Sequence, residues 1–493
     1  VADMTEHAAS FPILSCMLLS PIAGLLILLT LKEEQKFLIR AVSVVAGGIS
    51  LALAIFVFVT YDKGLGGLQF VEKYEWVKTF GITYFVGVEG LNAPMLLLTG
   101  IVIFTGCLTM WELENRTKEY FIWMMALVTG VFGVFMSYDM FFFFLFYEIA
   151  VVPMYILILV WGSTRKEYAA MKLTLYLMAG SGLIIPGILL LYSSSGLNTF
   201  NMLLLHQAHF TPWVQKVAFI LLFFGFGVLA AVWPLHTWSP VGHVAAPTAV
   251  SMLHAGVLMK LGSFAILRVA MFLLPEGFQY WANLMMLLAT AGIVYGVFVG
   301  LAQTDLKYVI GYSSVSHMGI VCLGLATGTI DGINGSVFQM FAHGIMTALF
   351  FSSVGYIYDR THTRDIHQLG GFSKIMPIAS AFFITAALCG AGVPGMASFW
   401  AELLVFIAAV KVFPVAGLLA IAALVLGALF ALRVVQSSFF NTPNPKFVHF
   451  EDVSPFLAIP RMILIGTLLF FGFFPQIMVS MIKSSIVPFL QGM

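Results

Sequence analysis

The sequence predicts an all-α polytopic membrane protein with about 14 transmembrane helices. Of its 493 residues, 61% are hydrophobic and 9% are charged. Soluble domains carry about 25% charged residues. Apolar runs of roughly 20 residues, the length that crosses a bilayer as a helix, recur along the whole chain. The net charge of +1 leaves no basic surface for nucleic acid. The composition therefore excludes a soluble enzyme built from one or two packed domains.

Hydropathy places the spans in order, with short loops between them. They are expected at 11–31, 40–60, 88–111, 120–137, 139–161, 168–193, 216–234, 248–273, 279–303, 308–328, 333–358, 375–409, 413–438 and 456–482. The longest polar segments are 61–87, 194–215, 359–374 and 439–455. They are too short to fold as soluble domains, so we expect no flavin, nucleotide or iron–sulfur cluster on this chain. The first ten residues lack a basic region, and we expect 11–31 to be a retained span rather than a signal peptide.

Lysine and arginine predict the orientation. One set of loops contains fifteen basic residues, and the opposite set contains seven, with Arg268 among them. The positive-inside rule places the fifteen on the cytoplasmic side. An even number of spans then puts both termini on the outer side of what we expect to be a bacterial cell membrane.

Two expected spans are interrupted by glycine and proline. The first, near 225–247, reads "GFGVLAAVWPLHTWSPVGHVAAP", and the second, near 390–398, reads "GAGVPGMAS". Broken helices at membrane depth are tolerated where protein or water lines the break, and in transporters they mark central sites. An ordinary turn is the alternative, more so for the first break, because Glu402 follows the second within two helical turns.

Three charged residues lie inside apolar runs: Glu148, Lys260 and Glu402. A charge at the bilayer centre costs at least ~2.5–3.5 kcal/mol, so such residues usually line ion pathways. A structural ion pair or snorkelling to the interface is the alternative. Because burial and neighbouring charges change how tightly such groups hold protons, making or breaking a Glu–Lys contact moves protons.

Histidines accompany these charges within the same expected spans. His254, His317 and His343 lie in or at the edge of spans 8, 10 and 11, and His236 and His243 lie in the first break. Histidine relays protons near neutral pH, although a lone buried histidine is more often a packing residue. None of the pairs has the spacing of a helical metal site, so we expect no metal.

Seven segments together resemble one family. They are "FYEIAVVPMY" (146–155), "PLHTW" (234–238), "HVAAPTAVSMLHAGVLMKLG" (243–262), "QTDLKYVIGYSSVSHMG" (303–319), "FQMFAHG" (338–344), "DIHQLGG" (365–371) and "GVPGMASFWAE" (392–402). The chain resembles the antiporter-like membrane subunits of respiratory complex I, NADH-quinone oxidoreductase, most closely the chain M type. This family is related to subunits of multisubunit cation/proton antiporters and membrane-bound hydrogenases.

The resemblance implies fourteen helices with two inverted five-helix repeats and broken helices 7 and 12. The expected parts are helices 1–3 (1–119), the first repeat with helices 4–8 (120–273), the second with helices 9–13 (274–438), and helix 14 (439–493). It also implies a proton relay of Glu148, Lys260, His317, His343 and Glu402. The loop residues Asp305 and Lys307 match a motif for which we favour a role in capping and anchoring span 10.

By the same resemblance, electron transfer elsewhere in an NADH:quinone oxidoreductase complex drives the relay. The chain itself does no redox chemistry. Flavin and iron–sulfur clusters are expected in partner subunits, alongside other membrane-arm subunits and the lipid bilayer. We expect this chain to bind neither nucleic acid nor a soluble small-molecule substrate.

One position departs from the family pattern. The family places a lysine in helix 7, five residues before the "PLH" proline, to pair with the helix-5 glutamate. Here the position is Leu229, and no Lys or Arg occurs from Val217 to Met259. Either His236, His254 or water replaces the lysine, or Glu148 is largely protonated, or pumping differs.

The sequence leaves three alternative functions open. The first is a subunit of a cation/proton antiporter or an inorganic-carbon transporter. The second is a membrane subunit of a hydrogenase complex, and the third is a scaffold that has lost pumping.

Overall fold

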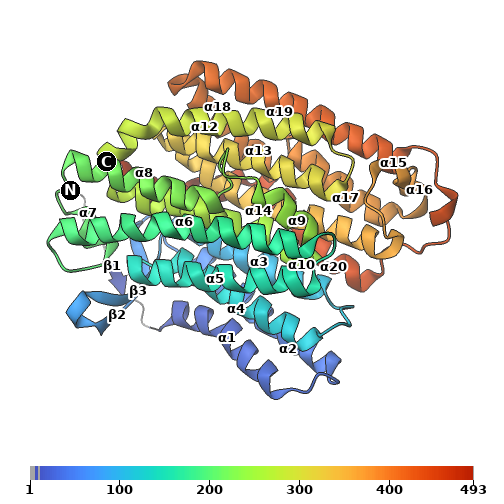
Figure 1. The fold of residues 1–493 in the computed structure, drawn as a ribbon, viewed down its shortest axis with the longest axis horizontal. Coiled ribbons are helices and arrows are strands. Elements are labelled where there is room, and N and C mark those ends of the chain that lie inside the picture. The colour runs from blue at the N-terminus through green and yellow to red at the C-terminus, as the bar shows by residue number, and fades with distance from the viewer. Residues whose placement is uncertain (1–5, 9–10, 492–493) are drawn as a thin grey trace.

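The structure is a computed structural model that describes residues 6–8 and 11–491 (Figure 1). Twelve of the described helices are long and apolar enough to cross a membrane, and Ala93–Thr109 and Pro377–Gly390 are shorter apolar helices. With the two broken spans each counted once, this confirms the expected polytopic helical fold. The axes of the helices are roughly aligned, and α14 lies in the middle of the bundle (Figure 1). The most apolar 18-residue windows of span 8 and α14 are fully buried.

The N-terminal part contains three helices and a small sheet. The helices are α1 (Ile13–Thr30), α2 (Lys36–Thr60) and α3 (Ala93–Thr109). The strands are β1 (Glu6–Ala8), β2 (Leu68–Val77) and β3 (Ile82–Val88), in the order β1-β2-β3. β1 is parallel to β2, and β2 is antiparallel to β3.

Strands β2 and β3 lie almost entirely in 61–87, which was predicted to be a polar segment between spans. β2 and β3 are joined through a short 3-10 helix, Lys78–Phe80, and by Gly81, whose φ of +63° suits glycine. The strands are rich in Val, Ile, Phe, Tyr and Trp, residues that favour strands. Because the segment is mixed in polarity, the hydropathy that located the spans did not reveal it.

The next five spans form a second group. Their elements are α4 (Thr117–Met136), α5 (Met140–Trp161), α6 (Lys166–Ser195), the short α7 (Met202–His206), α8 (Pro212–Leu229) and α9 (Trp238–Ala245). Span 8 follows as α10 (Thr248–Leu253), the π segment η2 (His254–Leu258), α11 (Met259–Ala265) and a second π segment, η3 (Ile266–Met271).

The remaining spans form a third group and a C-terminal pair. The third group contains α12 (Pro275–Ala302), α13 (Leu306–Ala326), α14 (Ile330–Thr361), α15 (Ile366–Leu369), α16 (Phe372–Ile375), α17 (Pro377–Gly390), α18 (Ala397–Val412), α19 (Pro414–Val435) and η4 (Gln436–Phe440). After η5 (Pro445–Phe447), the chain ends in α20 (Pro455–Phe473) and α21 (Pro475–Gln491). The expected last span, 456–482, is thus two helices that meet at Pro475.

Both predicted breaks are present. The helical ladder is interrupted between α8 and α9 at 230–237, and between α17 and α18 at 391–396. Ala231, Gly392 and Gly395 have positive φ there. Span 7 therefore continues beyond its expected end at 234 as the separate helix α9. In the expected numbering, the breaks fall in spans 7 and 12.

The two ends of the bundle differ. The sheet and α7 lie at one end, and α15 and α16 lie at the other (Figure 1). The C-terminal helix α21 returns to the sheet end, where the Gly90 amide donates a hydrogen bond to Ser485 Oγ at 2.7 Å. β1 pairs with β2 at this same end.

Candidate functional site: a buried line of ionisable side chains

Lys260 lies in α11, at the centre of the bundle, with its side chain fully buried. Its Nζ lies 2.7 Å from His343 Nδ1 on α14. It also donates a hydrogen bond to the carbonyl oxygen of Ala255. Because an ammonium group only donates, His343 Nδ1 accepts when Lys260 is charged, and the neutral ring then carries its proton on Nε2. Lys260 and His343 are therefore arranged to exchange a proton directly.

His317 continues this line on α13. Its ring is stacked on that of His343, with centroids 5.2 Å apart and an interplanar angle of 25°. His317 Nδ1 lies 2.8 Å from the carbonyl oxygen of Ser313. Since a carbonyl can only accept, Nδ1 carries a proton, which leaves Nε2 free to take or release the second one.

Glu402, on α18, lies next to His317 Nε2. Its Oε1 lies 3.5 Å from that nitrogen and accepts a hydrogen bond from Gln339 Nε2 at 3.1 Å. Within the described chain, Oε2 has no hydrogen-bond partner. A Cβ at Gly392, in the break of span 12, would lie 2.9 Å from Oε2. The break therefore brings main chain without a side chain against the free carboxylate oxygen.

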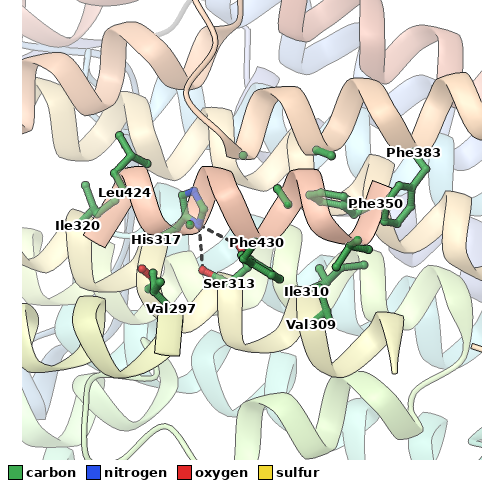
Figure 2. A pocket seen from close by; sticks show the side chains of 16 residues that line it. Val297, Val309, Ile310, Ser313, His317, Ile320, Phe350, Phe383, Leu424 and Phe430 are labelled. Carbon is green, nitrogen blue, oxygen red and sulfur yellow. Dashed lines mark hydrogen bonds between the residues drawn. The ribbon is translucent and has the colours of Figure 1, made fainter. Parts of the chain in front are cut away.

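An apolar crevice follows α13 past His317 (Figure 2). It lies between α12, α13, α14, α17 and α19 and has a cavity volume of about 30 Å³. Its polar lining residues are Ser313, Ser316 and His317, and the others are apolar, including Phe350, Phe383 and Phe430. Such a lining offers water few hydrogen-bond partners.

Glu148 stands apart from this line. It is half-buried on α5, and its Oε1 accepts a hydrogen bond of 2.5 Å from Ser181 Oγ on α6. Leu229, where the family has a lysine, is buried at the last residue of α8. In the described part of the chain, no ion pair joins Glu148 to a basic side chain.

The two histidines considered as replacements for the lysine are buried near the first break. His236 packs its ring edge-on against Tyr295, with centroids 4.8 Å apart. His254 begins the first π segment of span 8 and stacks on Trp238, with ring centroids 5.0 Å apart. Its ring is tilted at 46° against that of His243, with centroids 4.1 Å apart. Neither makes a hydrogen bond to Glu148 among the described contacts. Their role in place of the lysine stays a prediction.

Two buried ionisable residues were not predicted as site residues. Arg268 was counted among the loops of the outer side, and this is wrong, because it lies in η3 with 1% of its surface exposed. It forms an ion pair with Glu89, which is equally buried. His243 lies in the first break and was not predicted as a site residue, although its ring contacts that of His254 with centroids 4.1 Å apart. The signal for Arg268 was the apolar run "VAMFLL", which continues past it.

Asp305 and Lys307 anchor the start of α13, as expected. Asp305 Oδ1 caps the helix by accepting from the Lys307 amide at 2.8 Å, and Arg364 Nε lies 3.1 Å from Asp305 Oδ2. Lys307 Nζ donates to the carbonyl oxygen of Ala246 at 2.7 Å, which ties α13 to the turn after α9.

Comparison with known proteins identifies the family of this chain. The family described as "NADH:quinone oxidoreductase/Mrp antiporter, TM" matches residues 137–430, which include all of the ionisable residues in the buried line. The chain belongs to this family. It is an integral membrane protein.

Individual relatives cover most of the chain. It is 36% identical, over 81% of its length and 72% of the relative, to NAD(P)H-quinone oxidoreductase chain 4 2 of Microcystis aeruginosa. It is 31% identical, over 96% of its length and 98% of the relative, to NADH-quinone oxidoreductase subunit M of Rickettsia conorii. A chain of respiratory complex I from Thermus thermophilus matches with a TM-score of 0.90 and 26% identity, covering 97% of this chain and 99% of that one.

Proposed function

We propose that this chain is a proton-translocating membrane-arm subunit of a complex I-type NADH:quinone oxidoreductase. The observation that carries the proposal is the buried line Lys260, His343, His317, Glu402, in which each side chain contacts the next. Residues from four separate helical segments converge there, and a bilayer interior makes each charge costly. Membership of a family with NADH-quinone oxidoreductase relatives supports the coupling to electron transfer.

The roles follow from the contacts. Lys260 passes a proton to His343, and His343 passes one to His317. His317 releases a proton toward Glu402, whose free Oε2 faces the break of span 12. Glu148 is the acid at which protons enter, with Ser181 in place of the usual lysine as its contact. Redox chemistry takes place in partner subunits, which carry the flavin and iron–sulfur clusters.

The proposal includes an orientation and a division of the chain. The end with α15 and α16 faces the cytoplasm of a bacterial cell, and both termini lie on the outer side. Residues 120–273 and 274–438 are two inverted repeats. The equivalent positions of the two broken spans support this division.

The experiment that tests the proposal replaces Lys260 with Ala in the whole complex. The purified complex is reconstituted into vesicles, and protons pumped per electron are measured with quinone reduction. We expect the ratio to fall while quinone is still reduced. Lys411→Ala, at the exposed end of α18, is the matched control. An unchanged ratio in assembled Lys260→Ala complex would overturn the proposal.

A second candidate function is a subunit of a cation/proton antiporter, an inorganic-carbon transporter or a hydrogenase complex. The observation that favours it is Leu229, because this position departs from the lysine of the family. The discriminating measurement is the composition of the purified assembly. Flavin and iron–sulfur subunits support the oxidoreductase, nickel–iron subunits support the hydrogenase, and membrane subunits alone support the transporter.

The same departure leaves the scaffold reading to be tested. If Glu148 carries protons, Glu148→Gln lowers the number of protons pumped per electron. A scaffold that has lost pumping predicts no change in that ratio, and it also predicts that Leu229→Lys is tolerated.

A further inference from the structure

The helix that carries Lys260 changes its winding twice. The α-helical piece Met259–Ala265 lies between two π segments, His254–Leu258 and Ile266–Met271. A π segment accommodates an extra residue in the helix, and such segments occur often at functional sites. A shift of one residue turns a helical side chain by about 100°. The direction of Lys260 therefore depends on where these two π segments are held.

The second π segment is held by a buried ion pair. Arg268, in η3, pairs with Glu89, and each residue is 1% exposed. The guanidinium group also lies over the ring of Tyr138, 4.7 Å from its centroid, and 5.7 Å from the centroid of Phe264. Because an unpaired buried charge is strongly destabilising, the two charges resist separation.

Glu89 belongs to a rigid turn outside span 8. Its amide donates to Asn92 Oδ1 at 2.7 Å. Asn92 Nδ2 in turn donates to the carbonyl oxygens of Gly87 at 3.0 Å and Phe135 at 2.8 Å, which ties the turn to α4. The neighbouring Gly90 amide donates to Ser485 Oγ on α21. The carboxylate of Glu89 is thus a fixed point between the N-terminal, middle and C-terminal parts of the fold.

We propose that Glu89 and Arg268 are a positioning pair that holds the rotation of span 8, so that Lys260 Nζ meets His343 Nδ1. Arg268 lies eight positions along span 8 from the lysine whose direction the pair sets. The 2.7 Å contact between Lys260 and His343 leaves little freedom for rotation. The consequence for pumping rests on the proposed function of Lys260, whereas the effect on the helix does not.

The test removes both charges together. Glu89→Gln with Arg268→Met keeps similar side-chain volumes and leaves no charge unpaired, so the complex is expected to assemble. Hydrogen exchange of residues 259–271 is measured in the purified complex, together with protons pumped per electron. We expect exchange in this segment to rise at least about 10-fold and the proton ratio to fall, with quinone reduction retained.

The matched control is the ion pair that anchors α13. Asp305→Asn with Arg364→Met removes a partly buried pair at a distance of 3.1 Å, and Asn keeps the helix cap. We expect this variant to change neither readout. An equal rise of exchange in 259–271 in this control would overturn a specific role for Glu89 and Arg268.

The outcomes separate this inference from the proposed function. Unchanged exchange in the double variant overturns the positioning role, whatever the proton ratio. Raised exchange with an unchanged proton ratio supports the positioning role and contradicts the pumping role of Lys260. If the double variant does not assemble, Arg268→Lys keeps the charge but loses the planar fork, and the same two readouts apply.

Discussion

Replacing Glu402 with Gln tests the last step of the buried line. Gln has nearly the same shape, its carbonyl still accepts from Gln339, and the fold around the break should persist. What is lost is the charge that faces His317 Nε2 at 3.5 Å. Two unit charges at that distance attract by about 5 kcal/mol at an effective dielectric constant of about 20. A loss of this size raises the barrier for moving a proton onto His317, which lowers the rate of that step by roughly 10³-fold.

The assay is proton pumping per electron in vesicles that contain the reconstituted complex. At a rate lowered by roughly 10³-fold, this subunit contributes no protons during normal turnover, so the ratio should fall by the share of one subunit. Glu276→Gln, in the exposed first turn of α12, is the control and should leave the ratio unchanged. An unchanged ratio in assembled Glu402→Gln complex would refute the assignment of Glu402 to the relay.

Two further predictions concern stability. Leu229→Lys places a charge at a buried position, which should cost about 2.5–3.5 kcal/mol of stability unless the lysine reaches Glu148. In thermal unfolding, the substitution should therefore lower stability more in a Glu148→Gln background than in the native background. Equal losses of stability in both backgrounds would show that the two positions do not interact. Burial raises the pKa of the Asp139 carboxyl from 3.8 to about 6. The folded state thus binds this proton more tightly than the unfolded state, and the stability from this group, full below pH 3.8, is lost as pH rises through about 6. Asp139→Asn keeps an acceptor for the Phe141 amide and should flatten this part of the pH dependence of unfolding; an unchanged profile would contradict the reasoning.

Some site residues and some parts of the fold could be predicted from the sequence, and others could not. Glu148, Lys260 and Glu402 stand out in the sequence because each interrupts an apolar run, and hydropathy is a local property. The breaks were visible because glycine and proline act on their own stretch of backbone. The sheet strands at 68–88 were missed because they produce no local contrast in hydropathy. Arg268 does interrupt an apolar run, and its buried position was missed because it lies near the end of span 8 and was assigned to a loop.

The sequence by itself determined that this protein is a membrane bundle, where its spans lie, and which of its buried charges are costly. Only the tertiary structure decided which of them meet. Lys260 and His343 are 83 residues apart and touch because span 8 packs on α14. Arg268 forms an ion pair with Glu89, which is distant in the sequence, and Glu148 contacts Ser181 rather than a basic side chain. Such pairs depend on how helices pack against one another and on the π winding of span 8, and these properties arise from contacts that no single stretch of sequence contains.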